Sequence, residues 1–579
     1  MNTKKNLRRN NILELVFGLL IIIFLNIIGS YIFTRFDLTT EKRYTLSKAT
    51  KNLLKDLDHT VYFKVYLDGD FPSGFKRMQK ATKEMLDEFR AYNNKIQYEF
   101  INPSAFEKEE ERNAFYQELV RYGLKPTDIH VNKTGESSSQ IIFPGALVAG
   151  KSQEYPMQLL LSQMGVSPEN ILNNSIKNLE YNIATTIKKF SFKLPPKVGF
   201  ITGHQELDAL QTADAMTALS DYYKIERINI DGKINALTGR DLTDSVNPRI
   251  RNKFDAIIIA KPDSLFSEQD KFIIDQYLMR GGKILWLVDP VLAEMDSLSK
   301  QGTTMGIARK LNLEDMFFNF GVRLSTNLIM DLQSLQIPII TGSVGGQPQQ
   351  QFFNWHYFPV LSPTLRHPIV ANLNAIKSEF ISSIDTIGNS GIKKTILLES
   401  SKYTRTVNTP VLIDLESLRK PAEPEMFNRT PQAVAVLLEG EFKSLFSNRL
   451  TSELYDNKLI DFKERSSQTK MIIVSDGDII KNQIDYRNGR ALPLGYDRFT
   501  NQSFGNRDFI VNAVNYLLDE TGLMEVRLRD IQIRMLDKTR ISEQRLMWQI
   551  LNSTLPIILL IAFGIIQTRM RKAKYTKNK

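Results

Sequence analysis

The sequence predicts an α/β protein in which two membrane-anchoring helices flank two α/β domains. Three observations lead to this prediction. A long apolar segment lies near each end of the 579-residue chain, basic residues cluster outside both segments, and apolar strands alternate with helices through the middle. Such alternation is typical of a parallel, doubly wound sheet with helices on its faces.

The net charge of +11 comes almost entirely from the two ends of the chain. No acidic residue lies among these basic residues, and the long middle is close to neutral. A near-neutral middle lacks the electrostatic footprint of a nucleic-acid-binding protein, so we expect no nucleic acid partner. Anionic headgroups of a lipid bilayer are the expected partners of the tails. The basic residues are Lys4, Lys5, Arg8, Arg9, Arg569, Arg571, Lys572, Lys574, Lys577 and Lys579.

The first apolar segment, residues 15–34, predicts a membrane-spanning helix after a cytoplasmic tail of residues 1–14. About 19 apolar residues at a rise of 1.5 Å per residue nearly cross a hydrocarbon core of about 30 Å. A cleaved signal peptide is the alternative. The apolar region is long for a signal peptide and no small-residue cleavage pattern follows it, so we favour a retained anchor.

Residues 546–567 predict a second membrane-spanning helix, with Trp548 at the membrane interface. A juxtamembrane connector, residues 526–545, precedes this segment, and a basic cytoplasmic tail, residues 568–579, follows it. A buried amphipathic helix is the alternative. Two spans place both termini on one side, and short basic tails favour the cytoplasm. We therefore expect the large folded region on the opposite, extracytoplasmic side.

Residues 35–193 are expected to form an extracytoplasmic domain with a thioredoxin-like layout. Alternating and helical patterns follow one another in βαβ and then ββα order. The CxxC pair of a redox domain is absent, so we expect a structural or binding role. The predicted strands cover residues 61–67, 95–103, 141–150 and 154–161, and the predicted helices cover 75–93 and 168–190.

Residues 194–525 are expected to form the doubly wound domain, in which apolar strands alternate with helices. A β-rich insertion is expected at about 341–440, because residues 341–351 are rich in Gly and Gln and residues 352–363 are rich in aromatics. Packing against the sheet is the expected use of most of these aromatics, and a partner-facing surface is the alternative. The predicted strands cover residues 197–202, 224–230, 254–260, 283–290 and 471–478, and one predicted helix covers 267–282.

A candidate ligand crevice lies at the carboxyl ends of the predicted strands. In open α/β sheets ligands bind at these ends. Histidine beside carboxylates is typical of acid–base chemistry. The alternative, which we favour, is that the glycine makes a turn, Glu206 lies favourably at a helix start and the aspartates cap turns. The candidate residues are Gly203, His204, Glu206, Asp289, Asp476 and Asp478.

Motifs of catalysis are absent from the sequence. It contains no cysteine, which excludes disulfides, thiol nucleophiles and Cys-ligated metals. It also contains no P-loop, no G-x-S-x-G elbow and no HExxH pair. We therefore expect a non-enzyme without catalytic residues, metal or cofactor.

Several segments, in order, resemble the gliding-motility ABC transporter component family GldG of Bacteroidota. They are FDLTTEKRYTLS (36–47), VYLDGDFPSGF (65–75), VGFITGHQE (198–206), YLMRGGKILWLVDP (277–290), VSDGD (474–478) and GNRDFIVNAVNYL (505–517). The resemblance implies a fold like the class I glutamine amidotransferases for residues 194–525. The amidotransferase reaction needs a cysteine nucleophile, which this chain lacks.

The same resemblance implies the partners and the location. A GldA-like ATPase subunit and a GldF-like membrane subunit would supply the missing transporter parts. The chain would act as the substrate-binding or scaffold component at the bacterial inner membrane, with a periplasmic domain. Two alternatives remain. One is a membrane-tethered envelope enzyme that uses carboxylates and His204, and the other is a structural envelope protein without a transporter.

Overall fold

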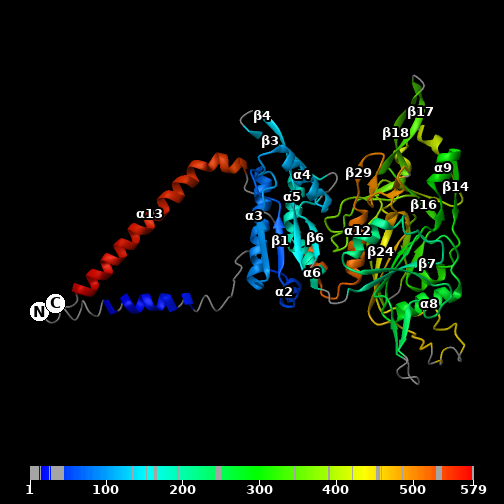
Figure 1. Ribbon diagram of the computed structural model, residues 1–579, viewed down its shortest axis with the longest axis horizontal. Coiled ribbons are helices and arrows are strands. Elements are labelled where there is room, and N and C mark those ends of the chain that lie inside the picture. The colour runs from blue at the N-terminus through cyan, green and yellow to red at the C-terminus, as the bar shows by residue number, and fades with distance from the viewer. Residues whose placement is uncertain are drawn as a thin grey trace. The chain divides into compact units, whose positions relative to one another are not determined.

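The structure is a computed structural model that separates into two compact units, Met1–Arg529 and Asp530–Lys579 (Figure 1). Each unit is considered by itself. The structure describes residues 12–13, 15–24, 26–27, 45–133, 136–151, 153–161, 166–191, 195–241, 249–344, 347–388, 391–419, 422–451, 455, 457, 460–485, 487–529 and 538–576.

The first domain is built on a four-stranded sheet in the order β2-β1-β5-β6. Strands β1 and β2 are parallel, while β5 is antiparallel to both β1 and β6. This is the predicted βαβ-then-ββα order, because α3 joins β1 to β2 and two helices follow β6. The elements are α2 (Lys48–Lys55), β1 (Val61–Val65), α3 (Ser73–Tyr92), β2 (Ile96–Phe100), α4 (Glu109–Arg121), β5 (Gly145–Gly150), β6 (Gln153–Gln158), α5 (Pro168–Lys177) and α6 (Leu179–Ser191).

Two features of this domain differ from the sequence prediction. The predicted strand 141–150 is divided, because β4 (Glu136–Ile142) pairs with β3 (Thr127–Lys133) in a separate hairpin before β5 begins. The single predicted helix 168–190 is two helices, α5 and α6, which meet at Asn178. Ser167 caps α5 as its sequence predicts, with its side chain accepting a hydrogen bond from the backbone N–H of Asn170.

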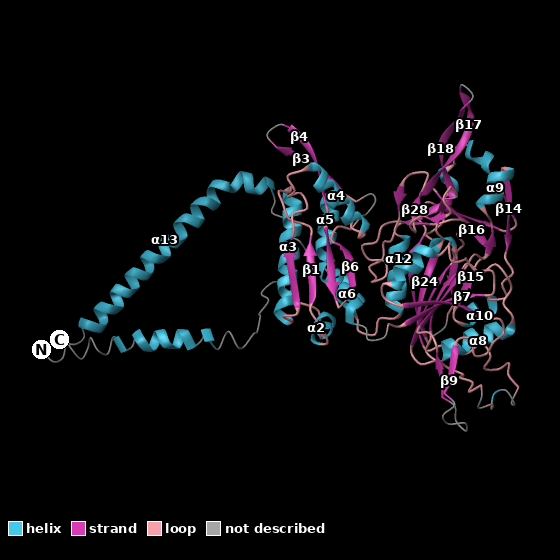
Figure 2. Ribbon diagram, viewed as in Figure 1, coloured by secondary structure: helices cyan, strands magenta, loops and turns pink. Residues whose placement is uncertain are grey.

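The second domain contains a seven-stranded sheet in the order β21-β24-β25-β12-β11-β7-β8 (Figure 2). Five neighbouring strands, β25 to β8, are parallel, whereas β24 runs antiparallel to both of its neighbours, β25 and β21. The prediction of a wholly parallel sheet is therefore wrong at one edge. The strands are β7 (Lys197–Thr202), β8 (Lys224–Asn229), β11 (Ala256–Ala260), β12 (Lys283–Leu287), β21 (Ile392–Glu399), β24 (Ala433–Gly440) and β25 (Thr469–Val474).

Apolar packing on this sheet forms the main core. All five residues of β11 are buried, as are the ring of Trp286 in β12 and that of Tyr277 in α8 (Glu268–Met279). A Cβ on Gly282 would lie 2.3 Å from the Tyr277 ring, so only glycine allows this ring to pack at the start of β12. The helices α7 (Ala213–Ser220), α10 (Glu314–Asn319) and α12 (Asn506–Leu517) also belong to this domain.

A β-rich region with its own core adjoins the main sheet. Its aromatic centre is Trp355, Tyr357 and Phe358, so the aromatic run of the sequence is largely packed inside the protein. The region starts at β13, well before residue 341, while β21 and β24 inside 341–440 belong to the main sheet. Its strands are β13 (Val291–Leu292), β14 (Thr303–Ala308), β16 (Asn327–Asp331), β17 (Ser334–Val344), β18 (Gln347–Leu361), β19 (Ile376–Lys377), β22 (Thr404–Asn408) and β23 (Val411–Asp414).

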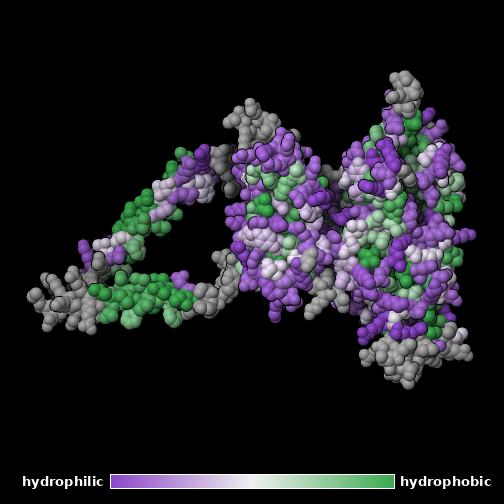
Figure 3. Space-filling model, viewed as in Figure 1, coloured by the Kyte–Doolittle hydropathy of each residue, from purple (hydrophilic) through white to green (hydrophobic). Residues whose placement is uncertain are grey.

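Helix α13 (Lys538–Thr576) makes up most of the second unit. None of its segment Glu543–Met570 is buried, and among the described residues α13 is the one helix long and apolar enough to cross a membrane. Figure 3 shows its apolar surface. Of the first predicted span, residues 15–24 form a shorter apolar helix, and several of the positions up to residue 34 lie outside the described residues.

Glu180 contacts residues at the start and at the end of the folded body of the first unit, residues 45–529. Its Oε1 accepts hydrogen bonds from the backbone N–H of Ser47 (2.6 Å) and the hydroxyl of Thr50 (2.8 Å), and its Oε2 lies 2.6 Å from Arg529 Nη1. The same Arg529 nitrogen donates to the carbonyl of Thr45 at 2.7 Å. Glu180 is only 3% exposed, whereas the Arg529 side chain is 26% exposed. Thr45 and Arg529 are therefore in direct contact beside this carboxylate, although 484 positions separate them in the sequence.

We expect Glu180→Gln to lower the stability of the first unit by roughly 1–3 kcal/mol, because Arg529 loses its ion-pair partner and the hydrogen bonds to Oε1 lose a charged acceptor. The full chain in detergent should show a lower Tm by differential scanning fluorimetry. Glu169→Gln is the matched control, since Glu169 is exposed. Equal Tm values for both variants would contradict the role given to Glu180.

Candidate functional site

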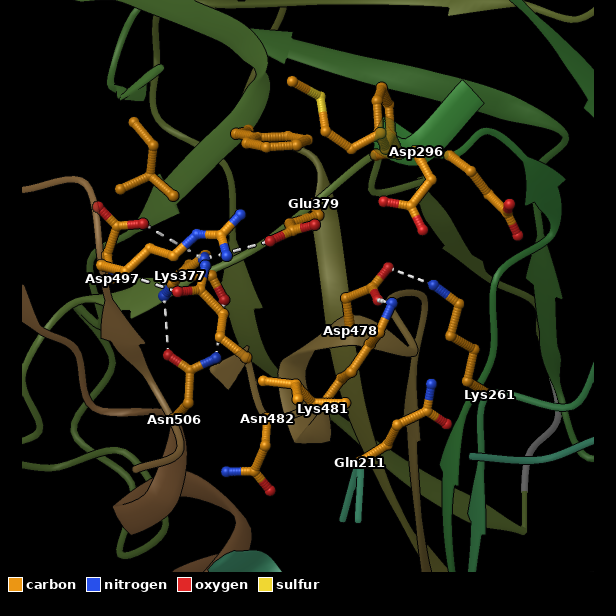
Figure 4. Close-up of a pocket in the computed structure, with 18 of the residues that line it drawn as sticks. Gln211, Lys261, Asp296, Lys377, Glu379, Asp478, Lys481, Asn482, Asp497 and Asn506 are labelled. Carbon is orange, nitrogen blue, oxygen red and sulfur yellow. Dashed lines mark hydrogen bonds and ion pairs between the residues drawn. The ribbon is translucent and has the colours of Figure 1, made fainter. Parts of the chain in front are cut away.

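A polar cavity of about 590 Å³ opens at the carboxyl ends of the parallel strands (Figure 4). Gln205 follows β7, Lys261 follows β11 and Asp478 follows β25, and all three line the cavity. The facing wall comes from residues 335–338 of β17 and from residues 495–499. This is the position at which open α/β sheets bind ligands.

Lys261 is the centre of the charged floor of this cavity. Its Nζ lies 2.5 Å from Asp478 and 3.1 Å from Asp289, and Lys481 contacts Asp478 at 3.3 Å. The ammonium therefore joins carboxylates that follow two other strands of the sheet, β12 and β25. Gly477 permits the close approach, because a Cβ there would lie 2.5 Å from the Cβ of Lys261.

Backbone hydrogen bonds fix the carboxylates of the floor. The N–H of Gly477 donates to Asp289, while the N–H groups of Asp478 (2.7 Å) and Glu379 (3.1 Å) donate to Asp476. Asp476 is fully buried behind the cavity. Three of the predicted site residues, Asp289, Asp476 and Asp478, are thus brought together by the fold, with ligating oxygens within 4.8 Å of one another.

The electrostatics of the floor are balanced within the chain. Burial opposes ionisation of Asp478, but the ammonium groups of Lys261 and Lys481 outweigh it and lower its pKa to about 2. Burial and the neighbouring Asp478 and Asp289 raise the pKa of Asp476 well above its usual range. The carboxylates also raise the pKa of Lys261, against its burial. Burial also raises the pKa of Asp289, with the Lys261 ammonium opposing this shift and the Asp478 carboxylate adding to it.

Three carboxylates at this spacing are a possible cation site. The Lys261 ammonium already contacts two of them, Asp289 and Asp478, at hydrogen-bond distance, so it takes the place that a bound cation would need. The donor set therefore fits an internal ion cluster better than a metal centre.

The backbone around the cavity is strained at three positions. Gln205, Lys261 and Phe380 all line the cavity and have φ values of +58°, +54° and +50°. Side chains of these types rarely adopt positive φ, and such conformations concentrate at functional sites. The strain at Lys261 coincides with the residue that organises the floor.

His204 and Glu206 form a different cluster, although they follow the same strand as Gln205. The two ring nitrogens of His204 lie 3.3 Å from Glu206 and 3.2 Å from Asp270, and the ring stacks on Phe266 at 3.7 Å. Burial lowers the pKa of His204, but the two carboxylates outweigh it and the pKa is raised. His204 is 4% exposed and does not line the cavity, so it connects the end of β7 to the start of α8.

Gly203 makes the turn that precedes this histidine. Its φ is +124°, and a Cβ there would lie 2.6 Å from the side-chain oxygen of Asn229. Glycine is therefore required for the turn, as the sequence indicates.

Sequence reasoning missed the cations of the cavity. Lys377 lies 3.2 Å from Glu379 and 3.6 Å from Asp497, and Arg309 pairs with Asp263. Lys261 could have been recognised as a candidate site residue, because it directly follows the apolar run AIIIA at the end of a predicted strand.

The family model of the ABC-type uncharacterized transport system matches residues 195–513, which is more than half of the chain. The chain belongs to this family. Its members are auxiliary components of ABC-type transport, and every residue that lines the cavity lies inside the matched range. The finding supports the expected ABC transporter relationship at this level.

The first domain and the whole chain also have matches. A domain of unknown function, DUF7088, matches residues 40–149. An uncharacterized protein of Borreliella burgdorferi is 23% identical over 580 residues, which cover 98% of this chain and 99% of that protein. Its similarity therefore extends beyond the auxiliary domain to both ends.

Two solved structures align with 56% of the chain. The N-terminal domain of mmIFT52 matches at 10% identity over 98% of its length, with a TM-score of 0.30. A ThuA-like protein from Parabacteroides merdae matches at 11% identity over 90% of its length, with a TM-score of 0.24. Neither likeness carries an argument about this chain.

We expect Lys261→Met to destabilise the auxiliary domain by roughly 3–5 kcal/mol, because it leaves Asp289 and Asp478 buried without their shared counter-charge. Without the ammonium these carboxylates take up protons more readily. The loss in Tm should therefore be larger near pH 7.5 than near pH 5, where protonation relieves the buried charge. Lys300→Met, at an exposed position, is the control. A loss that does not depend on pH would contradict this account.

Proposed function

We propose that this chain is a non-catalytic, membrane-anchored, extracytoplasmic component of an ABC-type transporter complex. It acts as a binding or scaffold subunit, and separate chains supply the ATPase and the permease. The observation that carries the proposal is the family match over residues 195–513, which contains the whole polar cavity. A P-loop is absent from the sequence, so ATP hydrolysis must come from another chain.

The arrangement of charged groups supports a binding role over catalysis. The carboxylates of the floor are engaged with Lys261 and Lys481, and His204 has both ring nitrogens against carboxylates away from the cavity. A general base or acid needs access to the substrate. The envelope-enzyme alternative assigned that chemistry to His204, and the observed contacts give this residue a structural role.

Within this proposal, we infer that the chain is a GldG-like component of a gliding-motility complex. The supporting residues are the segments shared with that family, from 36–47 to 505–517. A GldA-like ATPase and a GldF-like membrane subunit would then be the partners. The amidotransferase-like fold and the thioredoxin-like layout of residues 35–193 belong to this same proposal.

Anchoring at the bacterial inner membrane by two spans, with both termini cytoplasmic, completes the proposal. Helix α13 supports the second anchor by its length and hydropathy, and the apolar helix of residues 15–24 supports the first. The hydrogen bond from Arg529 to the carbonyl of Thr45 supports this arrangement, because it places the start and the end of the folded body next to each other.

We expect the full chain, purified from its own membranes in mild detergent, to bring with it an ATPase that contains a P-loop and a polytopic membrane subunit. Mass spectrometry of the purified material identifies both. Recovery of the chain without either subunit would favour the structural envelope protein and would refute the transporter role.

A substitution at His204 separates binding from catalysis. We expect His204→Ala to lower the Tm, because Glu206 and Asp270 lose their shared partner, and to reduce function only as far as folded protein is lost. The measurements are Tm, subunit recovery and gliding or secretion by the host. Normal folding and assembly with loss of function would favour the enzyme instead.

A further inference from the structure

The polar residues of the apolar part of α13 gather on one face of the helix. Gln549, Asn552 and Pro556 follow one another at spacings of three and four residues, which places them on a common face. At about 100° per residue, Ser553 and Gln567 lie within about 40° of Gln549 around the helix axis. These positions are the polar face of α13.

The opposite face of α13 is apolar apart from one threonine. The hydroxyl of Thr554 donates to the carbonyl of Ile550 at 2.8 Å, so it needs no partner outside the helix. On the polar face, the Ser553 hydroxyl likewise donates to the carbonyl of Gln549 at 2.9 Å. The opposite face is therefore suited to contact with lipid tails. Its apolar residues include Leu551, Ile558, Ile561 and Ile565.

The amide groups of the polar face are different, because the helix does not satisfy them. Among the described residues, the side chains of Gln549 and Asn552 make no hydrogen bond. Pro556 has no backbone N–H, so the carbonyl of Asn552, four residues earlier, also loses its helical partner. Asn552 thus presents an unpaired amide and an unpaired carbonyl at one position.

The depth of Asn552 makes these unpaired groups costly. In a membrane centred on Glu543–Met570, Asn552 lies about 7 Å from the mid-plane, well inside a hydrocarbon half-thickness of about 15 Å. No water is available there to pair with an amide or a carbonyl. A neighbouring membrane helix is therefore expected to supply the missing partners.

Charge indicates which helix this is. Arg545 lies one turn before Gln549 on the same face, is exposed and has no ion-pair partner among the described residues. A second copy packed in parallel through this face would bring two Arg545 side chains together, which is unfavourable. The first apolar helix offers little, because the amide of Asn26 already donates to the carbonyl of Ile22 at 3.2 Å. A helix of another subunit avoids both difficulties.

We infer that the polar face of α13 docks against a transmembrane helix of the permease subunit. That helix presents hydrogen-bonding side chains to Gln549 and Asn552 and a negative charge near Arg545, and the opposite face of α13 remains in contact with lipid. The inference rests on the proposed function and names the surface through which the two subunits meet in the membrane.

Photocross-linking of the full chain in the host membranes tests this surface. Benzoylphenylalanine is introduced singly at Ser553 or Leu560, which lie on one side of α13, and at Ile558 or Ile565, which lie on the other. We expect the first two positions to cross-link to a polytopic subunit and the last two to lipid. Cross-links from the first two positions to a second copy, to residues 15–34 of the same chain or to lipid alone would each overturn the inference.

Matched variants test the hydrogen bonds themselves. We expect Gln549→Leu with Asn552→Leu to lower recovery of the polytopic subunit in mild detergent about tenfold, because interhelical hydrogen bonds are lost. The control is Ser553→Ala with Thr554→Val, whose hydroxyls bond only to their own helix, and it should leave recovery unchanged.

The outcomes separate this inference from the proposed function. Full recovery of the polytopic subunit with the double leucine variant would refute the docking surface and leave the transporter role intact. Failure of the unchanged chain to recover any transporter subunit would refute the proposed function itself.

Discussion

The buried ion cluster around Lys261 is the constraint on which the geometry of the second domain depends. A single ammonium contacts the carboxylates of Asp289 and Asp478, and so connects the ends of β11, β12 and β25 at the level of the cavity. Burying these charges is costly, and the cost is offset only while the three groups stay together. The cluster therefore fixes the relative positions of the strand ends and the shape of the cavity floor.

The floor and the facing wall of the cavity have different physical roles. The floor is rigid and electrically neutralised, since its carboxylates are held by backbone N–H groups and ammonium groups. Glu294, Asp296 and Arg498, which also line the cavity, are exposed to solvent. A ligand is therefore expected to contact these side chains, while the floor supplies the strained and pre-organised support.

Much of the architecture was accessible from the sequence, for identifiable reasons. Fully apolar runs such as AIIIA mark the central parallel strands, and Ser167 and Ser267 mark helix starts. Strand direction carries no such signal, so the reversed direction of β24 was not predicted. The acidic cluster could be predicted because its residues follow the ends of neighbouring strands. The position of His204 away from this cluster could not be predicted. Neighbouring residues Gln205 and His204 point to different surroundings after one turn, and only the fold determines which reaches the cavity.

The junction at Glu180 has a consequence for the topology of the folded body. Arg529 donates hydrogen bonds both to the carbonyl of Thr45 and to this carboxylate, so the start and the end of the folded body lie next to each other. A short artificial linker between these residues would join the two ends of the folded body without rearranging it, and a cut in a surface loop would supply new ends. The folded body would then be a circular permutant without either apolar helix.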